Sequence, residues 1–387
     1  IYGTSFYIIM LSKLAIFDAH LYFFMMLSLY MILLAIHQPK CERVGFLLAG
    51  VATGLGVLSK GPISLVQQLL FMLPYLMLIG QLSVLRSIWL WLGIVVSILL
   101  PSPWYVVQLS RYGQPFFDIA LRDYTWYRFF GVVENQTGPW YYYFLVLFSF
   151  FPWVALVPSL IQRFISNRQW VGDSLKTKGR LFCWVAVIIT FVFFSIAQTK
   201  LPNYIYLVFP FLSILLADWL LAQTSKKAIV LPLSIYAVLA VIAGFTIAVY
   251  DIEPMDQRLF KTIFVALSFP LIPFFISFYK RFSWQKSFVM YLIGFFCTMI
   301  WLTHVILPRV SHYDDVKHAS DVILSISNGS LSNYTVIHYK GFKPSFMVRL
   351  NQNIPHISSD ADLKTYFTKN EYIKSSVFIL CQTDQVP

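Results

Sequence analysis

Long apolar segments separated by short polar connections dominate the first 307 residues of the chain. A helix needs about 20 mostly apolar residues to cross the hydrocarbon core of a bilayer. Segments that approach or exceed this length lie at 19–36, 44–58, 63–79, 88–105, 140–162, 181–197, 203–222, 228–250, 259–279 and 287–307. The pattern predicts an all-α polytopic membrane protein with about ten transmembrane helices.

Two of the apolar segments depart from a simple span. The segment at 44–58 holds Gly45, Gly50, Gly54 and Gly56, and such small residues predict close packing against neighbouring helices in lipid. The run Ile1–Leu11 would give only about 16 Å of helix, and it lacks the basic start and small-residue cleavage site of a signal peptide. We therefore expect it to be the tail of an interrupted helix in a longer chain.

The residues after 307 change character and predict a small soluble α/β domain at 308–387, which follows a transmembrane domain at 1–307. Helices are expected at 314–327, 344–350 and 361–368, and the β-branched runs at 334–339 and 376–381 are typical of strands. No glycine-rich phosphate loop opens any of these helices, so nucleotide binding is not expected.

The composition excludes a soluble protein, because 58% of the residues are hydrophobic, only 12% are charged and the mean hydropathy is +0.69. The net charge of +12 would suggest nucleic acid in a soluble chain, but here the charges lie in connections between apolar segments. We expect membrane lipids as surroundings and no nucleic-acid partner. The four cysteines are scattered and predict neither a disulfide framework nor a zinc ribbon.

Basic residues follow an alternating pattern that predicts the topology. By the positive-inside rule, the connections that carry them are cytoplasmic. The remaining connections, including the interfacial loop 106–139 and everything after 307, then face outward. The basic residues of the predicted cytoplasmic connections are Lys40, Arg43, Arg86, Arg163, Arg168, Lys176, Lys178, Arg180, Lys226, Lys227, Lys280, Arg281 and Lys286.

Polar residues gather at the outer rim, where a charge that faces a cavity is typical of a functional site. Asp18 directly precedes a span, so a helix cap is an open alternative to a functional carboxylate. Lys60 and Lys200 each precede a proline that opens the next helix, and two such turns on one face favour an anion site over simple snorkelling. In the loop 106–139, aromatic residues indicate an interfacial belt, whereas arginines such as Arg128 are suited to phosphate.

Four motifs in this order resemble a known superfamily. FDAHLYFF, GLGVLSKGPISL, YRFFGVVENQTGPWYYYF and AQTKLPNYIYL are similar to motifs of the GT-C membrane glycosyltransferases, in the superfamily of protein O-mannosyltransferases and aminoarabinose (lipid A) transferases. The resemblance covers about 13–217, and the C-terminal domain matches the bacterial branch. It implies an enzyme of the bacterial inner membrane, with its active site on the extracytoplasmic face. This enzyme would move a sugar from a polyprenyl-phosphate donor, with inversion, to a lipid A, protein or envelope-glycan acceptor.

The resemblance also implies roles for individual residues. Asp18 matches the acidic residue close to the reacting sugar, and Lys60 and Lys200 match lysines on the donor-phosphate side. Arg128 matches the arginine of the outer loop's RF motif, and Tyr204 follows the second lysine turn into the cavity.

The chain departs from the superfamily at two places. The main acidic motif, in the first outer loop, is absent, so we expect the general base upstream and Asp18 to orient the sugar or acceptor. The histidine that serves as a metal ligand before the PW motif has no counterpart in 134–137, so no metal site or other cofactor is carried over. The cluster of His304, His312, Asp314 and His318 fits no standard zinc spacing.

Two other functions stay open at this point. A transporter or flippase of a lipid-linked or anionic substrate would also carry intramembrane charges, but near the bilayer midplane instead of at one rim. An assembly subunit would use the aromatic outer loop as a protein-binding surface, which leaves the paired lysine turns unexplained.

Overall fold

Two compact units make up the chain in the computed structural model, with residues 1–222 in a helical unit and residues 315–381 in a smaller α/β unit. The structure describes residues 1–12, 17–132, 136–151, 153–166, 172, 174–222, 286, 289–290, 293–294, 297, 315–331, 334–339, 345–357, 359–369 and 376–381. The expected boundary at 307/308 and most of the last three apolar segments lie outside these residues.

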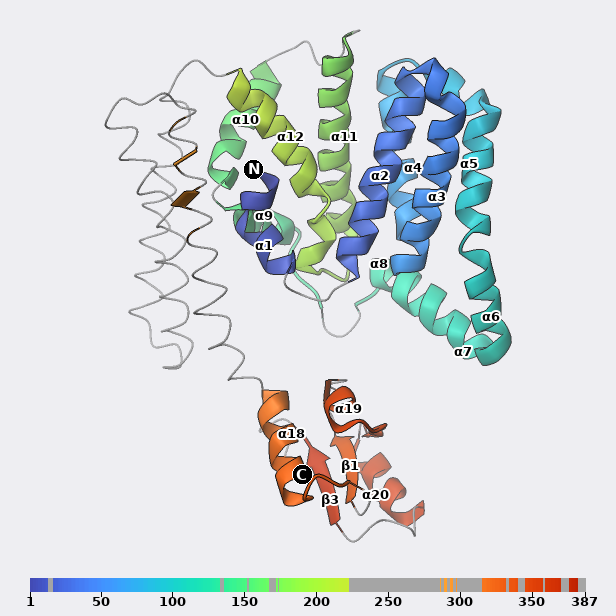
Figure 1. The fold of residues 1–387 in the computed structure, drawn as a ribbon, viewed down its shortest axis with the longest axis vertical. Helices are drawn as coiled ribbons and strands as arrows, with labels where there is room; N and C mark the ends of the chain where they lie inside the picture. Colours follow the sequence, from blue (N-terminus) through green and yellow to red (C-terminus); the bar gives the residue numbers. More distant parts are fainter. Residues whose placement is uncertain are drawn as a thin grey trace. The chain divides into compact units, whose positions relative to one another are not determined.

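Helices of the first unit coincide with the first seven apolar segments, and several run side by side (Figure 1). Within the described residues, the stretches Asp18–His37, Pro39–Lys60, Ile88–Tyr112 and Leu175–Ile196 are long and apolar enough to span a membrane. The helices are α1 (Phe6–Ser12), α2 (Asp18–His37), α3 (Glu42–Lys60), α4 (Ile63–Leu78), α5 (Ile88–Leu99), α6 (Ser102–Tyr112), α7 (Gln114–Phe117), α8 (Arg128–Phe130), α9 (Tyr142–Leu147), α10 (Val157–Ser166), α11 (Leu175–Ile196) and α12 (Val208–Leu221).

The glycine-rich helix α3 packs closely against α2 and α5, as its sequence predicts. A Cβ atom on Gly50 would clash with the backbone of Gly93 in α5, and one on Gly45 would clash with Ala35 in α2. Small residues therefore let these helices approach almost to backbone contact, which is how helices gain packing energy in lipid.

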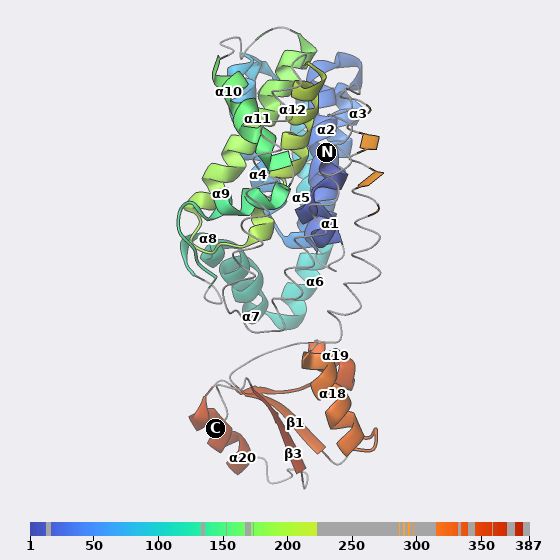
Figure 2. The same ribbon diagram turned by 90° about the vertical axis from the view of Figure 1, so that its left-hand side faces the viewer.

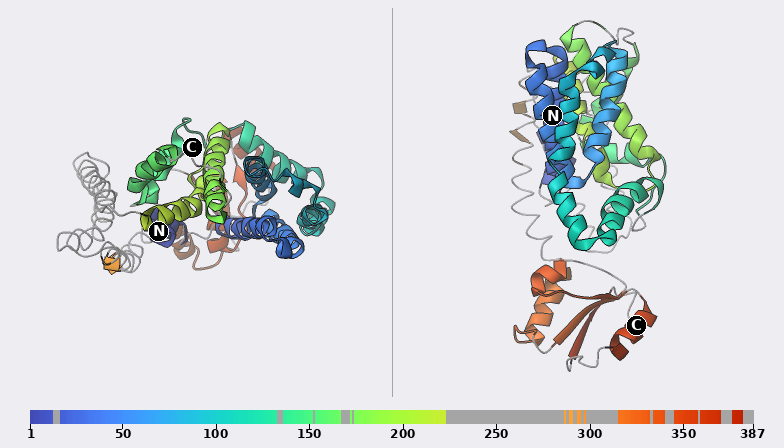
Figure 3. Two further views of the ribbon diagram at one scale, coloured as in Figure 1. Left: turned by 90° about the horizontal axis from the view of Figure 1, so that it is seen from above. Right: turned by 90° about the vertical axis from the view of Figure 1, so that its right-hand side faces the viewer.

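The outer loop is largely helical and begins later than predicted. Pro101 and Pro103 fall at the start of helix α6, where a missing N–H is tolerated. The helix continues to Tyr112 instead of ending near Tyr105, and Gly113, with a φ of +59°, ends it. After α6 the chain turns sharply and returns toward the bundle through α7, the π-helical segment η4 (Asp118–Tyr127) and α8 (Figure 3). These short helices lie across one end of the helices α2–α5 (Figure 1).

The C-terminal unit is a three-stranded parallel sheet with helices on both faces (Figure 2). The central strand β1 (Tyr334–Tyr339) pairs with β2 (His356–Ile357) and β3 (Ser376–Leu380). Val336 packs with α18 (Asp315–Ile326) and α19 (Ser345–Leu350), whereas Ile337 packs with α20 (Asp360–Lys369). Successive residues of β1 thus point to opposite faces of the sheet and fill two small cores, as expected for a parallel sheet buried on both sides. The predicted α/β pattern is confirmed, and only the two-residue strand β2 was not expected.

Candidate functional site

The first lysine turn lies at the end of α3. The helix ends at Lys60 because Gly61 adopts a φ of +81°, which residues with a side chain rarely adopt. Pro62 then opens α4. Since α2 and α3 are consecutive antiparallel neighbours, this turn brings Lys60 to the end of the bundle where α2 begins.

Asp18, at the start of α2, is buried and has partners at both carboxylate oxygens. The Lys60 ammonium forms an ion pair with Oδ1, and Asn203 donates a hydrogen bond from Nδ2 to Oδ2 at 2.9 Å. Tyr22 fixes the backbone of Asn203 by donating to its carbonyl oxygen at 2.7 Å. Only 4% of Asp18 is exposed, so the carboxylate holds two chain segments together more than it faces solvent.

Tyr204 connects this ion pair to the outer loop. Its ring centroid lies 5.7 Å from Lys60 Nζ, a cation–π distance. Its hydroxyl accepts a hydrogen bond from Arg128 Nη1 at 3.3 Å. Lys60 therefore contacts the ring of Tyr204 and Arg128 contacts its hydroxyl, although the two cations are far apart in the sequence.

The loop that carries Arg128 is held by backbone hydrogen bonds to the second lysine turn. Amide groups of residues 198–200 donate to carbonyls of the outer loop. The bonds run from Gln198 to Phe129 at 2.9 Å, from Thr199 to Arg128 at 3.2 Å and from Lys200 to Gln136 at 2.9 Å, and the Thr199 hydroxyl donates to Gly131 at 2.9 Å. The position of Arg128 is thus fixed by pairing between segments about 70 residues apart, as the separation of Thr199 and Gly131 illustrates.

Lys200 makes contacts of a different kind from those of Lys60. Only 7% of this residue is exposed, and its ammonium donates to the carbonyls of Ser195 at 2.9 Å and Ala197 at 2.6 Å. These carbonyls belong to the end of α11, where backbone acceptors lack partners within the helix. Burial lowers the pKa of Lys200 below its usual value. Lys200, which the sequence predicts to bind an anion, therefore stabilises the end of helix α11.

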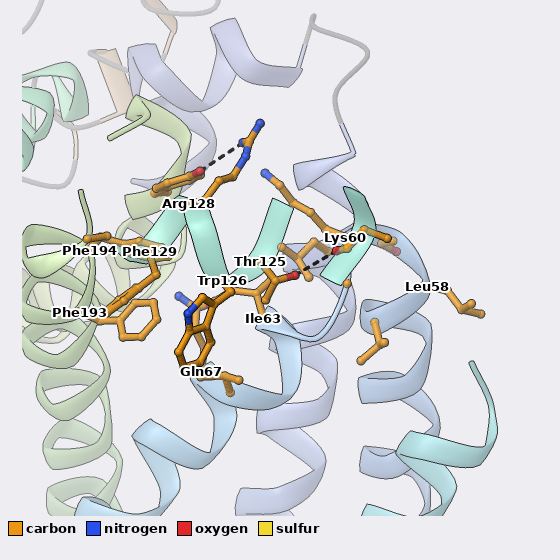
Figure 4. A pocket seen from close by; sticks show the side chains of 18 of the residues that line it. Leu58, Lys60, Ile63, Gln67, Thr125, Trp126, Arg128, Phe129, Phe193 and Phe194 are labelled. Carbon is orange, nitrogen blue, oxygen red and sulfur yellow. Dashed lines mark hydrogen bonds between the residues drawn. The ribbon is translucent and has the colours of Figure 1, made fainter. Parts of the chain in front are cut away.

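A cavity of about 580 Å³ lies between the outer loop and the ends of α3 and α4. Lys60, Arg128 and Tyr204 line it, and so do aromatic residues of the loop and of α11, such as Trp126 and Phe193 (Figure 4). Thr125 donates to the Ala120 carbonyl at 3.3 Å, a bond between residues five apart that fits the π-helical backbone of this wall. The cavity therefore lies beside Lys60, whereas Lys200 is not among the described residues that line it.

The structure thus brings together four of the five predicted site residues, Asp18, Lys60, Arg128 and Tyr204, and places Lys200 on the adjoining turn. Sequence reasoning missed Asn203, although it follows the proline of that turn directly. Among the described residues, no three His, Cys, Asp or Glu side chains form a group that fits a metal ion. Residues 133–135, His304, His312 and Asp314 lie outside them.

Chemically, this arrangement suits an amphiphilic anion. Lys60 and Arg128 supply positive charge on one part of the wall, and the aromatic and aliphatic side chains around them exclude water. Guanidinium and ammonium groups in such surroundings bind phosphate more strongly than they do in water.

Comparisons with known proteins agree with this picture. Residues 1–112 match a family model described as dolichyl-phosphate-mannose-protein mannosyltransferase. An uncharacterized protein of Aquifex aeolicus is 29% identical over 294 residues, which are 75% of this chain and 53% of that protein. An undecaprenyl phosphate-alpha-4-amino-4-deoxy-L-arabinose arabinosyl transferase of Erwinia tasmaniensis is 29% identical over 52% of this chain and 36% of its own length. The chain thus spans about half the length of these relatives or less.

Solved structures show the same fold. The crystal structure of ArnT from Cupriavidus metallidurans bound to undecaprenyl phosphate has a TM-score of 0.69 and 20% identity, and the match covers 93% of this chain and 66% of that one. The apo structure of the same protein gives a TM-score of 0.68. The chain is thus similar to the mannosyltransferase family model over residues 1–112, to arabinosyl transferases in sequence and to ArnT in fold, in agreement with the motifs.

Proposed function

We propose that the protein is an integral-membrane glycosyltransferase that moves a sugar from a polyprenyl-phosphate donor to an extracytoplasmic acceptor with inversion. One observation carries this proposal: Lys60 and Arg128 lie on the wall of one largely apolar cavity and share Tyr204. A polyprenyl phosphate has matching chemistry, with a phosphate for the two cations and an isoprenoid chain for the apolar wall.

The transfer step needs stabilisation of the leaving group. The acceptor oxygen or nitrogen attacks the anomeric carbon, the bond from this carbon to the phosphate oxygen breaks, and polyprenyl phosphate leaves with the bonding electrons. Negative charge grows on the phosphate as this bond breaks. Lys60 and Arg128 would stabilise that charge, which is the effect that accelerates such reactions most.

Asp18 has a supporting role in this mechanism. Both of its oxygens are occupied by Lys60 and Asn203, so the carboxylate is poorly placed to take a proton from the acceptor. We propose that it acts through Lys60, whose ammonium it directs, and that a carboxylate outside the described residues accepts the proton.

Names of the relatives support the donor class. The arabinosyl transferases carry undecaprenyl phosphate in their names, and the ArnT crystal structure contains it. The family model names a dolichyl-phosphate sugar and a protein. A lipid A, protein or envelope-glycan acceptor is compatible with this cavity.

The orientation in the membrane is also part of the proposal. The alternating basic residues support a bacterial inner-membrane protein in which this cavity faces the extracytoplasmic side. Residues 1–307 would then form the transmembrane transferase domain and 308–387 an extracytoplasmic α/β domain.

Transfer of a labelled sugar from polyprenyl phosphate tests the proposal. Membranes that contain the protein are incubated with the labelled donor, and lipid, protein and glycan fractions are counted. Label in one of these fractions, lost in the Lys60→Ala variant, is expected. Movement of intact donor across vesicles without any transfer would instead show a flippase.

A further inference from the structure

Two adjacent glutamines of α4 lie in contrasting surroundings. Gln68 is buried, and its Oε1 accepts hydrogen bonds from the hydroxyls of Ser28 and Thr53, each at 2.9 Å. Its Nε2 donates to Ser64 at 3.5 Å. Gln68 is therefore satisfied by the protein itself, as buried polar groups usually are.

Gln67 lacks such a partner for its amide nitrogen. The residue is 2% exposed, and no acceptor among the described residues lies within hydrogen-bond distance of its buried Nε2. A buried amide without a hydrogen bond costs free energy, and methionine or leucine would fill the same space without that cost. A glutamine at this place suggests an acceptor that arrives with a ligand.

The position of Gln67 indicates where that ligand would bind. Ile63, Val66 and Gln67 line the same 580 Å³ cavity as Lys60 and Arg128. Helix α4 begins directly after the Lys60 turn, and Gln67 lies one helical turn, about 6 Å, beyond Ile63. Gln67 thus belongs to the wall of the cavity that Lys60 and Arg128 also line, and a small turn of its amide would present Nε2 to a ligand there.

The chemistry of the donor lipid offers one type of neutral acceptor near its phosphate. The phosphate itself is suited to Lys60 and Arg128, and the isoprenoid chain offers no hydrogen-bond acceptor at all. The hydroxyl and ring oxygens of the attached sugar are neutral acceptors next to the phosphate, and a neutral amide N–H matches them.

We propose that Gln67 is a sugar-binding residue that donates a hydrogen bond from Nε2 to an oxygen of the glycosyl group on the lipid donor. This inference rests on the proposed function and assigns the substrate-recognition residue within that cavity. Gln67 contributes to the choice of sugar, because a site built to hydrogen-bond an oxygen discriminates against a sugar that lacks it.

The test compares Gln67→Met with its neighbour, Gln68→Met. Steady-state transfer gives the KM for the labelled donor, and thermal stabilisation of the purified protein by polyprenyl phosphate without a sugar gives the affinity for the lipid phosphate alone. Gln67→Met is expected to raise the donor KM about tenfold, the effect of one hydrogen bond, with unchanged affinity for the sugar-free lipid.

Gln68→Met is the control variant, and the outcomes distinguish failure of the Gln67 inference from failure of the transferase proposal. Gln68→Met is expected to lower the melting temperature and to keep the donor KM, whereas Gln67→Met keeps or raises the melting temperature. An unchanged donor KM in Gln67→Met, or an equal loss of affinity for the sugar-free lipid, would overturn the inference while the transferase proposal stands. Absence of any transfer by the wild-type protein would overturn both.

Discussion

The two lysine turns look alike in the sequence and differ in the structure. In each, a lysine stands two residues before a proline that opens the next helical segment. Lys60 is the last residue of α3, lines the cavity and pairs with Asp18. Lys200 lies four residues beyond the end of α11 and donates to the carbonyls of Ser195 and Ala197.

The residue between lysine and proline explains much of this difference. Gly61 allows the chain to turn directly after Lys60, so the Lys60 side chain projects from the end of the helix. Leu201 has extended backbone, and the longer turn lets Lys200 fold back over the carbonyls of α11. A shared motif therefore contains one lysine suited to a ligand and one suited to a helix end, and substitutions can separate these roles.

Substitution of Lys60 should have the largest effect. Lys60→Ala removes a charge that would stabilise the leaving phosphate, so turnover should fall by about 10²–10³. It also leaves Asp18 buried without its cation, so the melting temperature should fall. Labelled-sugar transfer at matched expression measures the first effect. Turnover within a few-fold of wild type would remove Lys60 from the site.

Substitution of Arg128 should have the second largest effect. Arg128→Ala also removes a charge that would stabilise the leaving phosphate, so turnover should fall by about 10². Arg122 is the matched control, because it lies in the same loop but is exposed and pairs with Asp118 and Asp123. Exposed ion pairs contribute little, so Arg122→Ala should keep turnover and stability close to wild type. Equal losses in both variants would indicate a general effect of loop charge.

Asp18→Asn should have a smaller effect that depends on Lys60. The amide keeps the size of the side chain but no longer directs the ammonium, so turnover should fall about tenfold, which corresponds to about 1.4 kcal/mol. In the Lys60→Ala background the same change should cost almost nothing further. Additive losses in the double variant would mean that Asp18 acts on the substrate independently, as the superfamily resemblance predicts.

Lys200→Met should have the smallest effect on chemistry. The variant loses two hydrogen bonds to carbonyls at the end of α11, so stability should fall by about 1–2 kcal/mol. Turnover at a temperature well below melting should stay within about threefold of wild type, because less than 1 kcal/mol of transition-state stabilisation is at stake. Thermal melting and transfer assays on one preparation measure both quantities. A large loss of turnover with unchanged melting would restore Lys200 to the phosphate site.

The sequence predicts the helices well because membrane spans follow from the length of apolar runs. Described helices such as α2 and α4 begin and end within about two residues of the expected segments. The strands at 334–339 and 376–381 could also be predicted, because both runs are rich in β-branched and aromatic residues. The short strand β2 was not predicted, because two residues carry no periodicity.

The sequence predicts which residues belong to the site better than it predicts the contacts between them. Asp18, Lys60, Arg128 and Tyr204 could be named from motifs, yet their pairing depends on segments up to 185 residues apart, such as Asp18 and Asn203. The direction of a flexible lysine depends on which acceptors lie near it, and no local pattern encodes that. Similarly, the contrast between Gln67 and Gln68 needs the positions of Ser28 and Thr53.

The affinity of the purified protein for sugar-free polyprenyl phosphate tests the central claim most directly, because it needs neither the donor sugar nor the acceptor. Lys60→Ala and Arg128→Ala should each weaken the Kd by at least about tenfold, as expected for a lost charge-assisted hydrogen bond, while Lys200→Met and Arg122→Ala bind like wild type. Wild-type affinity in both Lys60→Ala and Arg128→Ala would contradict the assignment of this cavity to the lipid phosphate.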